Sequence, residues 1–192
     1  MGLDIKVDNF ELGDTYFGDA LLKCEWNNEK EKLATNITFT NKNQKIVDAS
    51  GDIDIFKKSL DLDLVLDKSP TDLLGTLLPF LFYNVQGTVS GRVDMTGSFS
   101  DIQFNGILKP DEQVGIGVNA IKTTYFFSDP VIFHNDSLVF KSIEINDEFG
   151  NKGMLNGFLT HTNMSSNVGY NISISTDKIC GMNTTSYDLR VS

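Results

Sequence analysis

The chain has few of the residue types that build catalytic and metal sites. It contains two cysteines and two histidines in 192 residues. Cys24 and Cys180 lie far apart and outside any spacing typical of zinc or redox sites, which predicts buried free thiols, although the sequence leaves a disulfide between them open. His134 and His161 are equally isolated, with neither a zinc spacing nor a neighbouring nucleophile, so structural roles are favoured for both.

Positive charge is scarce as well. Sixteen Lys and Arg stand against 26 Asp and Glu, giving a formal net charge of -10 and a pI near 4.5. Nucleic-acid binding depends on Lys and Arg contacts to phosphates, so this balance argues against a nucleic-acid partner and against docking flat on an anionic membrane. The longest apolar run, Leu77 to Tyr83, contains Pro79 and is too short to cross a bilayer. The chain opens without a basic or apolar leader, so we expect any targeting segment to be missing or removed.

Catalytic signatures are missing too. There is no P-loop, no G-x-S-x-G, no H-E-x-x-H and no calcium-binding loop. Two aspartate pairs, Asp52 with Asp54 and Asp61 with Asp63, resemble glycosidase carboxylates only out of context, because each pair falls on the polar side of its own predicted strand. We therefore predict no catalytic residue, no metal and no cofactor, and an enzyme is the least favoured reading.

In many segments of the chain, apolar and polar residues alternate. In Leu60 to Leu66, four leucines face one way and Asp61 and Asp63 face the other, and ionised carboxylates opposite leucines fix which side meets water. Other segments repeat this pattern: Leu3, Ile5 and Val7; Leu22, Cys24 and Trp26; Ile37 and Phe39; Ile53 and Ile55; Val114, Ile116 and Val118; Leu138 and Phe140; Ile143 and Ile145; Tyr170, Ile172 and Ile174. The pattern predicts an all-β chain.

The segment from Gly87 to Pro110 is the most informative one. It reads as two strands of an antiparallel sheet, with Val89, Val93 and Met95 on one face and Arg92, Asp94 and Thr96 on the other. Gly91 leaves a gap in the apolar face, which indicates a bulge or a close approach of backbone or ligand. Predicted turns separate the strands at Asn28, Asn41 to Asn43, Gly51, Ser128 to Pro130, Asn135 and Asp136, Asn146 to Gly150, and Thr162 to Asn167.

One stretch has helical spacing instead. Ser69 is a candidate N-cap, Pro70 suits the first helical position, and Pro79 would bend or end the helix. Its apolar stripe consists of Leu73, Leu74, Leu77, Leu78 and Leu81. We predict one short amphipathic helix that covers the end of the sheet as a lid; a movable plug and a contact with lipid remain alternatives.

Several segments resemble the TamB family of translocation and assembly module proteins. The resemblance rests on the Gly87 to Pro110 block, on Tyr125 to Phe127 and Leu138 to Phe140, and on Asn146 to His161. The G-x-x-x-G strand of this family is matched by Gly87 and Gly91, its D-x-x-G turn by Asp147 and Gly150, and its closing Gly-x-x-x-His by Gly157 and His161. These motifs are structural, and the resemblance covers about residues 60 to 176.

The resemblance implies a fold and a function. It implies a long curved antiparallel sheet folded into a groove with an apolar lining, of which residues 1–192 would be a single β-repeat fragment. It further implies a periplasmic location, an inner-membrane anchor outside this chain, and conduction of phospholipid between the inner and outer membranes. The family is also associated with outer-membrane protein assembly, which makes assembly proteins a second class of partner.

The residues suit such a role. Eight strand residues span roughly 26 Å, about the length of an acyl chain, and exposing sixteen carbons to water costs on the order of 12 kcal/mol. The candidate groove residues are Leu60, Leu62, Leu64, Leu66, Val89, Val93, Met95, Val114, Ile116, Val118, Leu138, Phe140, Ile172 and Ile174. Two alternatives stay open: a β-edge platform that pairs with outer-membrane strands, and a sealed structural sandwich or solenoid. In every case we expect the sheet edges to drive self-association.

Overall fold

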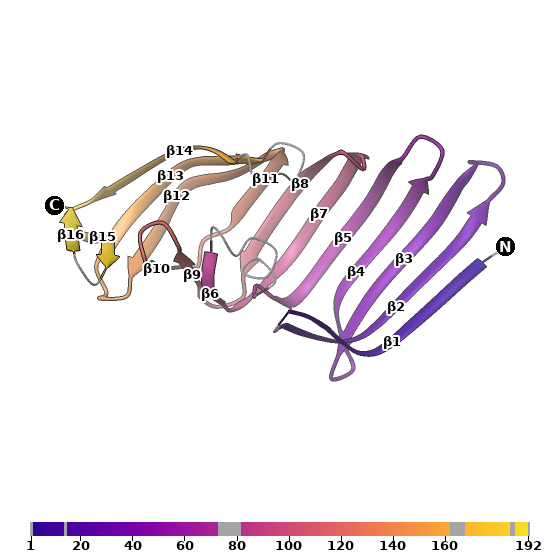
Figure 1. The fold of residues 1–192 in the computed structure, drawn as a ribbon, viewed down its shortest axis with the longest axis horizontal. Coiled ribbons are helices and arrows are strands. Elements are labelled where there is room, and N and C mark those ends of the chain that lie inside the picture. Colours follow the sequence, from indigo (N-terminus) through magenta and orange to yellow (C-terminus); the bar gives the residue numbers. More distant parts are fainter. Residues whose placement is uncertain (1, 14, 73–81, 162–167, 185–186, 192) are drawn as a thin grey trace.

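The computed structural model describes residues 2–13, 15–72, 82–161, 168–184 and 187–191, with side chains described except at 12, 161, 168 and 182–191. All the regular elements in these ranges are β-strands, and all their pairings are antiparallel, which confirms the predicted all-β fold (Figure 1). The strands are β1 (Gly2–Leu12), β2 (Thr15–Asn27), β3 (Lys32–Asn41), β4 (Gln44–Asp54), β5 (Ser59–Pro70), β6 (Phe82–Gln86), β7 (Thr88–Ser98), β8 (Asp101–Pro110), β9 (Val114–Val118), β10 (Thr123–Phe127), β11 (Val131–Asn135), β12 (Ser137–Asp147), β13 (Lys152–His161), β14 (Val168–Thr176), β15 (Ile179–Thr184) and β16 (Tyr187–Val191).

Fourteen of these strands form one open sheet. Its main path runs β1-β2-β3-β4-β5-β7-β8-β11-β12 and continues through β13 to β14, while β15 and β16 form a separate two-stranded sheet. Figure 1 shows the strands following one another along the long axis of the molecule, with β1 and β14 toward opposite ends. Most neighbours on this path are also neighbours in sequence, because short turns suffice to connect antiparallel strands.

The sheet forks at β12. One edge of β12 pairs with β13, whereas the other edge pairs with β11 through residues 137–139 and with β10 through residues 145–147. From β10 the branch continues through β9 to β6. Asp129, in the connection between β10 and β11, accepts a hydrogen bond from the backbone N–H of Glu144 at 2.8 Å. This bond satisfies part of the β12 backbone between its two partners.

Bulges set the alternation of three long strands. Asn9, Lys68 and Ser142 have positive φ angles of 55°, 50° and 51°, and each lies at a shift in strand register. In each bulge a side chain of the neighbouring strand accepts the backbone N–H: Asp19 Oδ1 at 3.1 Å, Ser90 Oγ at 2.9 Å and Asn156 Oδ1 at 2.8 Å, respectively. These bonds hold the inserted residues in place, and each insertion moves the subsequent side chains to the other face.

Gly91 and Gly51 are among the strand glycines that lie where a side chain could not. Gly91 has a φ of 156°, and a Cβ atom there would lie 2.1 Å from the carbonyl oxygen of Ile107. The predicted close approach of backbone at Gly91 is therefore confirmed. Gly51, predicted as a turn, is instead an interior residue of β4 opposite Leu62, with a φ of 155°, so that turn prediction is wrong. Glycine breaks a strand pattern in sequence, but here it allows two strands to approach.

No helix is seen in the described residues, and none of them provides a helix long and apolar enough to cross a membrane. The predicted start of the helix is wrong, because Ser69 and Pro70 are the last two residues of β5 and pair with Val89 and Thr88. Pro70 suits a strand end as well as a helix start, since in both places its missing N–H costs little. The predicted lid residues Leu73, Leu74, Leu77, Leu78 and Leu81 lie outside the described residues.

Candidate functional site

A continuous row of apolar residues crosses the whole sheet. With one residue from each strand of the main path from β1 to β14, this central row consists of Ile5, Leu22, Ile37, Ala49, Leu64, Val93, Gly106, Phe133, Leu138, Leu159 and Tyr170. Directly opposite residues of antiparallel strands share a face, so all of these lie on one side of the sheet, called here the apolar face. Gly106 is its one member without a side chain.

The adjacent row, on the outer face, has the opposite character. It consists of Asp4, Lys23, Asn36, Ser50, Asp63, Asp94, Asn105, His134, Ser137, Thr160 and Gly169. Asp63 and Asp94 stand directly opposite each other, and Arg92 forms an ion pair with Asp63 that offsets part of their repulsion. One step along the strands thus separates an apolar row from a polar one over the full sheet.

The structure places the predicted groove residues together on the apolar face. Leu60, Leu62, Leu64 and Leu66 alternate along β5, and their partners on β7 include Met95 and Val93. The bulge at Ser142 keeps Phe140 and Ile143 on the same face of β12, opposite Gly157 and Leu155. Beyond them Ile172 and Ile174 pair with Gly157 and Leu155. Val89 lies on the same face of β7, two residues before Gly91. Val114 of β9 is opposite Phe127 of β10, which is opposite Ile145 of β12, so Val114 shares the face of Ile145. Ile116 and Val118 follow Val114 on the same face of β9.

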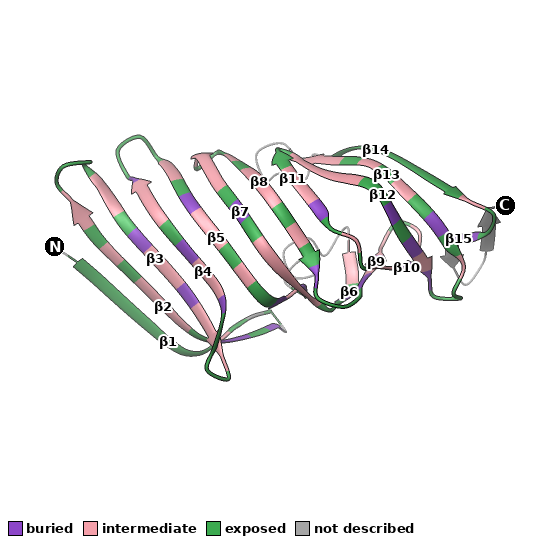
Figure 2. Cartoon of the chain, turned by 180° about the vertical axis from the view of Figure 1, so that it is seen from behind, coloured by how far each residue is buried: buried purple, intermediate pink, exposed green. Residues whose placement is uncertain are grey.

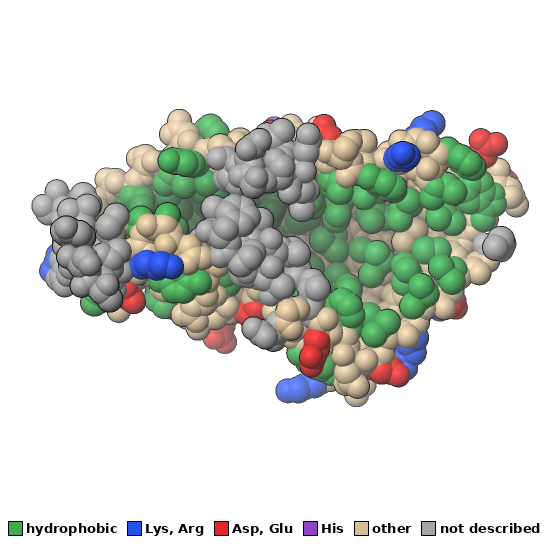
Figure 3. All heavy atoms as spheres, viewed as in Figure 1, with side chains coloured by type: hydrophobic (Ala, Val, Ile, Leu, Met, Phe, Trp, Pro, Cys, Tyr) green, Lys and Arg blue, Asp and Glu red, His purple; other side chains and the backbone are tan. Residues whose placement is uncertain are grey.

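The apolar face is exposed at its N-terminal end. Leu3, Ile5 and Val7 of β1 remain 53%, 43% and 42% exposed although they point to this face. A hollow of about 210 Å³ lies there, lined by Ile5, Val7, Phe10, Ala20, Leu21, Leu22, Ile37 and Phe39. Figure 3 shows hydrophobic side chains spread over this end of the sheet, with charged side chains confined to its margins. A water-exposed apolar surface of this kind is typical of a binding surface.

Three phenylalanines close one end of this hollow. The ring of Phe10 lies 5.3 Å from that of Phe39 and 6.1 Å from that of Phe17, and the Phe17 and Phe39 rings are 5.7 Å apart. Phe17 is buried. Phe10 was not predicted as a site residue because the bulge at Asn9 breaks the odd-numbered alternation of β1, and Phe17 of β2 lies at a second register shift, between Phe10 and Glu11. A β-bulge leaves no reliable mark in a single sequence.

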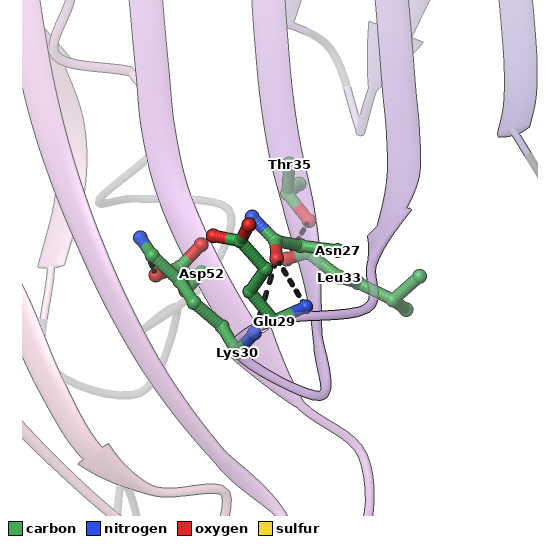
Figure 4. Close-up of polar contacts among 6 residues, drawn as sticks. All are labelled: Asn27, Glu29, Lys30, Leu33, Thr35 and Asp52. Carbon is green, nitrogen blue, oxygen red and sulfur yellow. Dashed lines mark hydrogen bonds and ion pairs between the residues drawn. The ribbon is translucent and has the colours of Figure 1, made fainter.

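The β2–β3 and β4–β5 turns form a rim at the other end of these strands, outside the lining of the hollow. Asn27 Oδ1 accepts the backbone N–H groups of Glu29 and Lys30, both at 3.0 Å, and Lys30 Nζ binds Asp52 Oδ2 at 2.9 Å (Figure 4). Trp26, the only tryptophan, packs edge-on against Phe56 with ring centroids 6.0 Å apart. The rim therefore combines aromatic rings with charged side chains.

The C-terminal part of the apolar face is covered. Ile143 and Ile145 of β12, Val131 of β11 and Ile179 of β15 form a buried cluster, with Ile143 only 1% exposed. Figure 2 marks the buried residues of β12 beside β10 and β15. The hydroxyl of Tyr125 donates to the carbonyl oxygen of Cys180 at 2.7 Å and so ties β15 to β10. Burial raises the pKa of Tyr125 to about 12, so the hydroxyl keeps its proton at neutral pH.

Asp147 anchors the same cover from the end of β12. Its Oδ2 accepts the backbone N–H of Cys180 at 2.8 Å and the amide of Asn151 at 2.8 Å, and its Oδ1 accepts the N–H groups of Phe149 and Asn151. Burial alone would raise the pKa of this carboxyl, but these hydrogen bonds prevail and lower it. Gly150 donates its N–H to the carbonyl oxygen of Asp147 at 3.0 Å, so the D-x-x-G motif forms the β12–β13 turn.

A larger hollow, of about 310 Å³, lies on the outer face. It is lined by Glu144, Lys152, Gly153, Met154, Ser175, Thr176 and Asp177, and Lys152 Nζ binds Glu144 Oε1 at 2.7 Å. Five of these seven residues are polar or charged, and the charges of Lys152 and Glu144 neutralise each other. It therefore offers little apolar surface to a ligand, and the N-terminal hollow is the better candidate site.

The remaining predicted residues have simple places in the structure. Cys24 and Cys180 are both free, as predicted; Cys180 is buried, whereas Cys24 is half-buried on the apolar face. His134 is exposed in the polar row of the outer face. None of these three residues lines the N-terminal hollow.

Comparison with known proteins adds nothing to this geometry. No protein-family model, curated protein or solved structure matches the chain. The resemblance to the TamB family therefore stays a prediction that rests on the motifs at Gly87, Asp147 and Gly157. The apolar face itself is the main indication of function.

Proposed function

We propose that the apolar face binds lipid acyl chains and that the chain is a segment of a periplasmic apolar groove that conducts phospholipid between two membranes. The observation that carries the proposal is the central row, which is apolar or glycine from β1 to β14 and begins at an exposed Ile5. A continuous row lets a chain move from strand to strand without meeting a polar group. No chemical step is needed, only a surface that replaces water.

The energetics favour this use of the face. Each methylene removed from water contributes about 0.8 kcal/mol, so a lipid chain that covers part of the hollow gains several kcal/mol. Leu3, Ile5 and Val7 would lose their own contact with water in the same step. The acidic outer face, with its polar row, keeps such a sheet soluble while the lipid is bound.

One observation favours a second reading, a sealed structural sheet. The cluster around Ile143 and Ile179 has no room for a chain, and it occupies the same face as the hollow. Under this reading the N-terminal hollow would be closed by a further apolar element. The two readings differ in whether the N-terminal end of the purified chain takes up lipid.

The test uses two matched variants on β2. Leu22 lines the hollow, whereas Lys23, its neighbour, is exposed on the outer face. Leu22→Gln should weaken binding of a fluorescent fatty acid by about tenfold or more, because burying an amide without a partner costs about 1–3 kcal/mol. Lys23→Gln introduces the same side chain on the other face and should bind as the unmodified chain does.

Native mass spectrometry of the purified chain completes the test. We expect adducts of phospholipid mass on the unmodified chain and on Lys23→Gln, and fewer on Leu22→Gln. Equal lipid uptake by the two variants at equal folded concentration would contradict a binding role for the apolar face.

A further inference from the structure

The outer edge of β14 is the least protected edge of the sheet. Within the described residues of the fourteen-stranded sheet, three strands have one edge without a partner: β1, β6 and β14. β6 is only five residues long and its pairing is bulged. β14 runs for nine residues and pairs with β13 with no register shift. It therefore presents the longest regular row of free backbone N–H and C=O groups after β1.

Charge distinguishes β14 from β1. β1 carries Asp4, Lys6 and Asp8, with Lys6 Nζ bound to Asp8 Oδ1 at 2.6 Å, and it is bulged at Asn9. Charges and bulges are the devices with which proteins prevent pairing at an edge. β14 has neither a charged residue nor a proline between Val168 and Thr176. Its sequence has the alternation, β-branched residues and neutrality of a segment that pairs readily with another strand.

The strand that fits this edge best is β14 of a second copy of the chain. In an antiparallel pair centred on Ile172, Ile172 faces its own copy, Tyr170 faces Ile174, and Asn171 faces Ser173. From Tyr170 to Ile174, each apolar residue then meets an apolar one and each polar residue a polar one, and neither strand carries a charge. Aromatic and β-branched pairs of this kind stabilise antiparallel sheets. Tyr170 is 77% exposed in the single chain, so this pairing would cover a large ring.

The directions of the two edge strands, β1 and β14, also favour pairing of β14 with β14. Neighbours along the main path are all antiparallel, so β1 and β14, which are separated by an even number of pairings, run the same way. Joining β14 to β1 of another copy with the apolar faces aligned would require a parallel pair in an otherwise antiparallel sheet. A two-fold axis perpendicular to the sheet at Ile172 keeps the pairing antiparallel and both apolar faces on one side.

We propose that β14 pairs with β14 of a second copy about a two-fold axis at Ile172, forming a symmetric dimer with one continuous apolar face. The proposal is independent of lipid binding, because it depends only on the edge of the sheet. Tyr170, the last residue of each central row, would then face Ile174 of the other copy, so that the apolar face continues from one copy to the next.

Sedimentation velocity over a concentration series tests the dimer with two matched variants. Ile172 and Ile5 are 42% and 43% exposed and lie on the apolar face of the two opposite edge strands. Ile172→Lys brings two like charges face to face at the axis and should raise the dimer dissociation constant by about 30-fold or more. Ile5→Lys makes the same change at the other edge and should leave the dimer intact.

A cross-link tests the register. With Cys24→Ser as background, Ile172→Cys should form a disulfide-linked dimer on mild oxidation, because self-facing residues have Cα atoms about 4.5–5.5 Å apart. Ile5→Cys in the same background should remain monomeric under reducing-agent-free gel analysis. A chain that is monomeric at all concentrations would overturn the proposal. So would a dimer dissociated by Ile5→Lys, or a dimer in which Ile172→Cys does not cross-link. Since no lipid is added, either result leaves the lipid-binding proposal to its own test.

Discussion

The two ends of the sheet use the same alternation for different purposes. At the N-terminal end, Ile5 and Leu22 face a hollow and stay in part exposed, whereas at the C-terminal end Ile143 and Ile145 lie under β15. The strands themselves do not differ, since their apolar row is continuous from one end to the other. The difference lies in the cover, because in the described part of the chain it is the C-terminal end on which a further strand, β15, packs through Ile179. The apolar surface at the N-terminal end therefore corresponds to the buried cluster without an element that covers it.

The largest effect should separate these two ends directly. Ile143→Ala removes a side chain that is 1% exposed and should lower the free energy of unfolding by about 3–4 kcal/mol through the lost burial and the cavity left behind. Ile5→Ala, at 43% exposure, should cost less than about 1 kcal/mol. Urea denaturation measures both. Equal losses would show that the N-terminal end is covered in solution as well.

The next effect concerns the approach of the strands beneath the apolar face. Gly91→Ala places a Cβ atom 2.1 Å from the carbonyl oxygen of Ile107 and should cost about 3 kcal/mol, since β7 and β8 must separate. Gly150→Ala is the control, because its φ of 80° is equally unusual for alanine but nothing lies within 4 Å. That change should cost about 1–2 kcal/mol. Similar values for the two variants would show that the contact at Gly91 is not tight.

A smaller effect should appear as a pH dependence of the covered end. The lowered pKa of Asp147 means that its stabilising effect is fully present above the ordinary value of 3.8 and is lost as the pH falls through the folded-state value. Asp147→Asn should therefore cost about 2 kcal/mol at pH 7, because donors at Cys180 and Asn151 lose a charged acceptor. The difference from the unmodified chain should shrink below about pH 4. Urea titrations at both pH values measure it, and a constant difference would contradict the role of the ionised carboxylate.

The sequence predicted the faces better than the boundaries of the site. Alternation alone assigned Leu60 to Leu66 and Val93 to the apolar face, since period two fixes the side of a strand residue whatever its neighbours are. It did not predict Phe10, because the bulge at Asn9 is stabilised by Asp19 of the next strand. It did not predict the cover either, because Ile179 reaches the core through contacts with residues far away in sequence.

The wrong predictions share a physical cause. Ser69 and Pro70 fit a helix start in their local pattern, and Gly51 fits a turn, yet all three are paired with a neighbouring strand. Pairing with another strand overrode the local preference in each case. Single-residue signals are weakest where the sheet itself supplies the partner.

The most direct test of the central claim uses the only tryptophan as a probe. Trp26 lies on the apolar face at the rim of the N-terminal end, in the row that continues through Leu33, Ile53 and Leu60. A phospholipid brominated on its acyl chains should quench Trp26 fluorescence, and the same lipid without bromine should not. The control is Trp26→Phe combined with Phe158→Trp, which moves the probe to a residue opposite Val139 on the outer face, 39% exposed. Quenching at Trp26 but not at residue 158 is the predicted result. Equal quenching at both, or none at Trp26, would contradict an acyl-chain site on the apolar face.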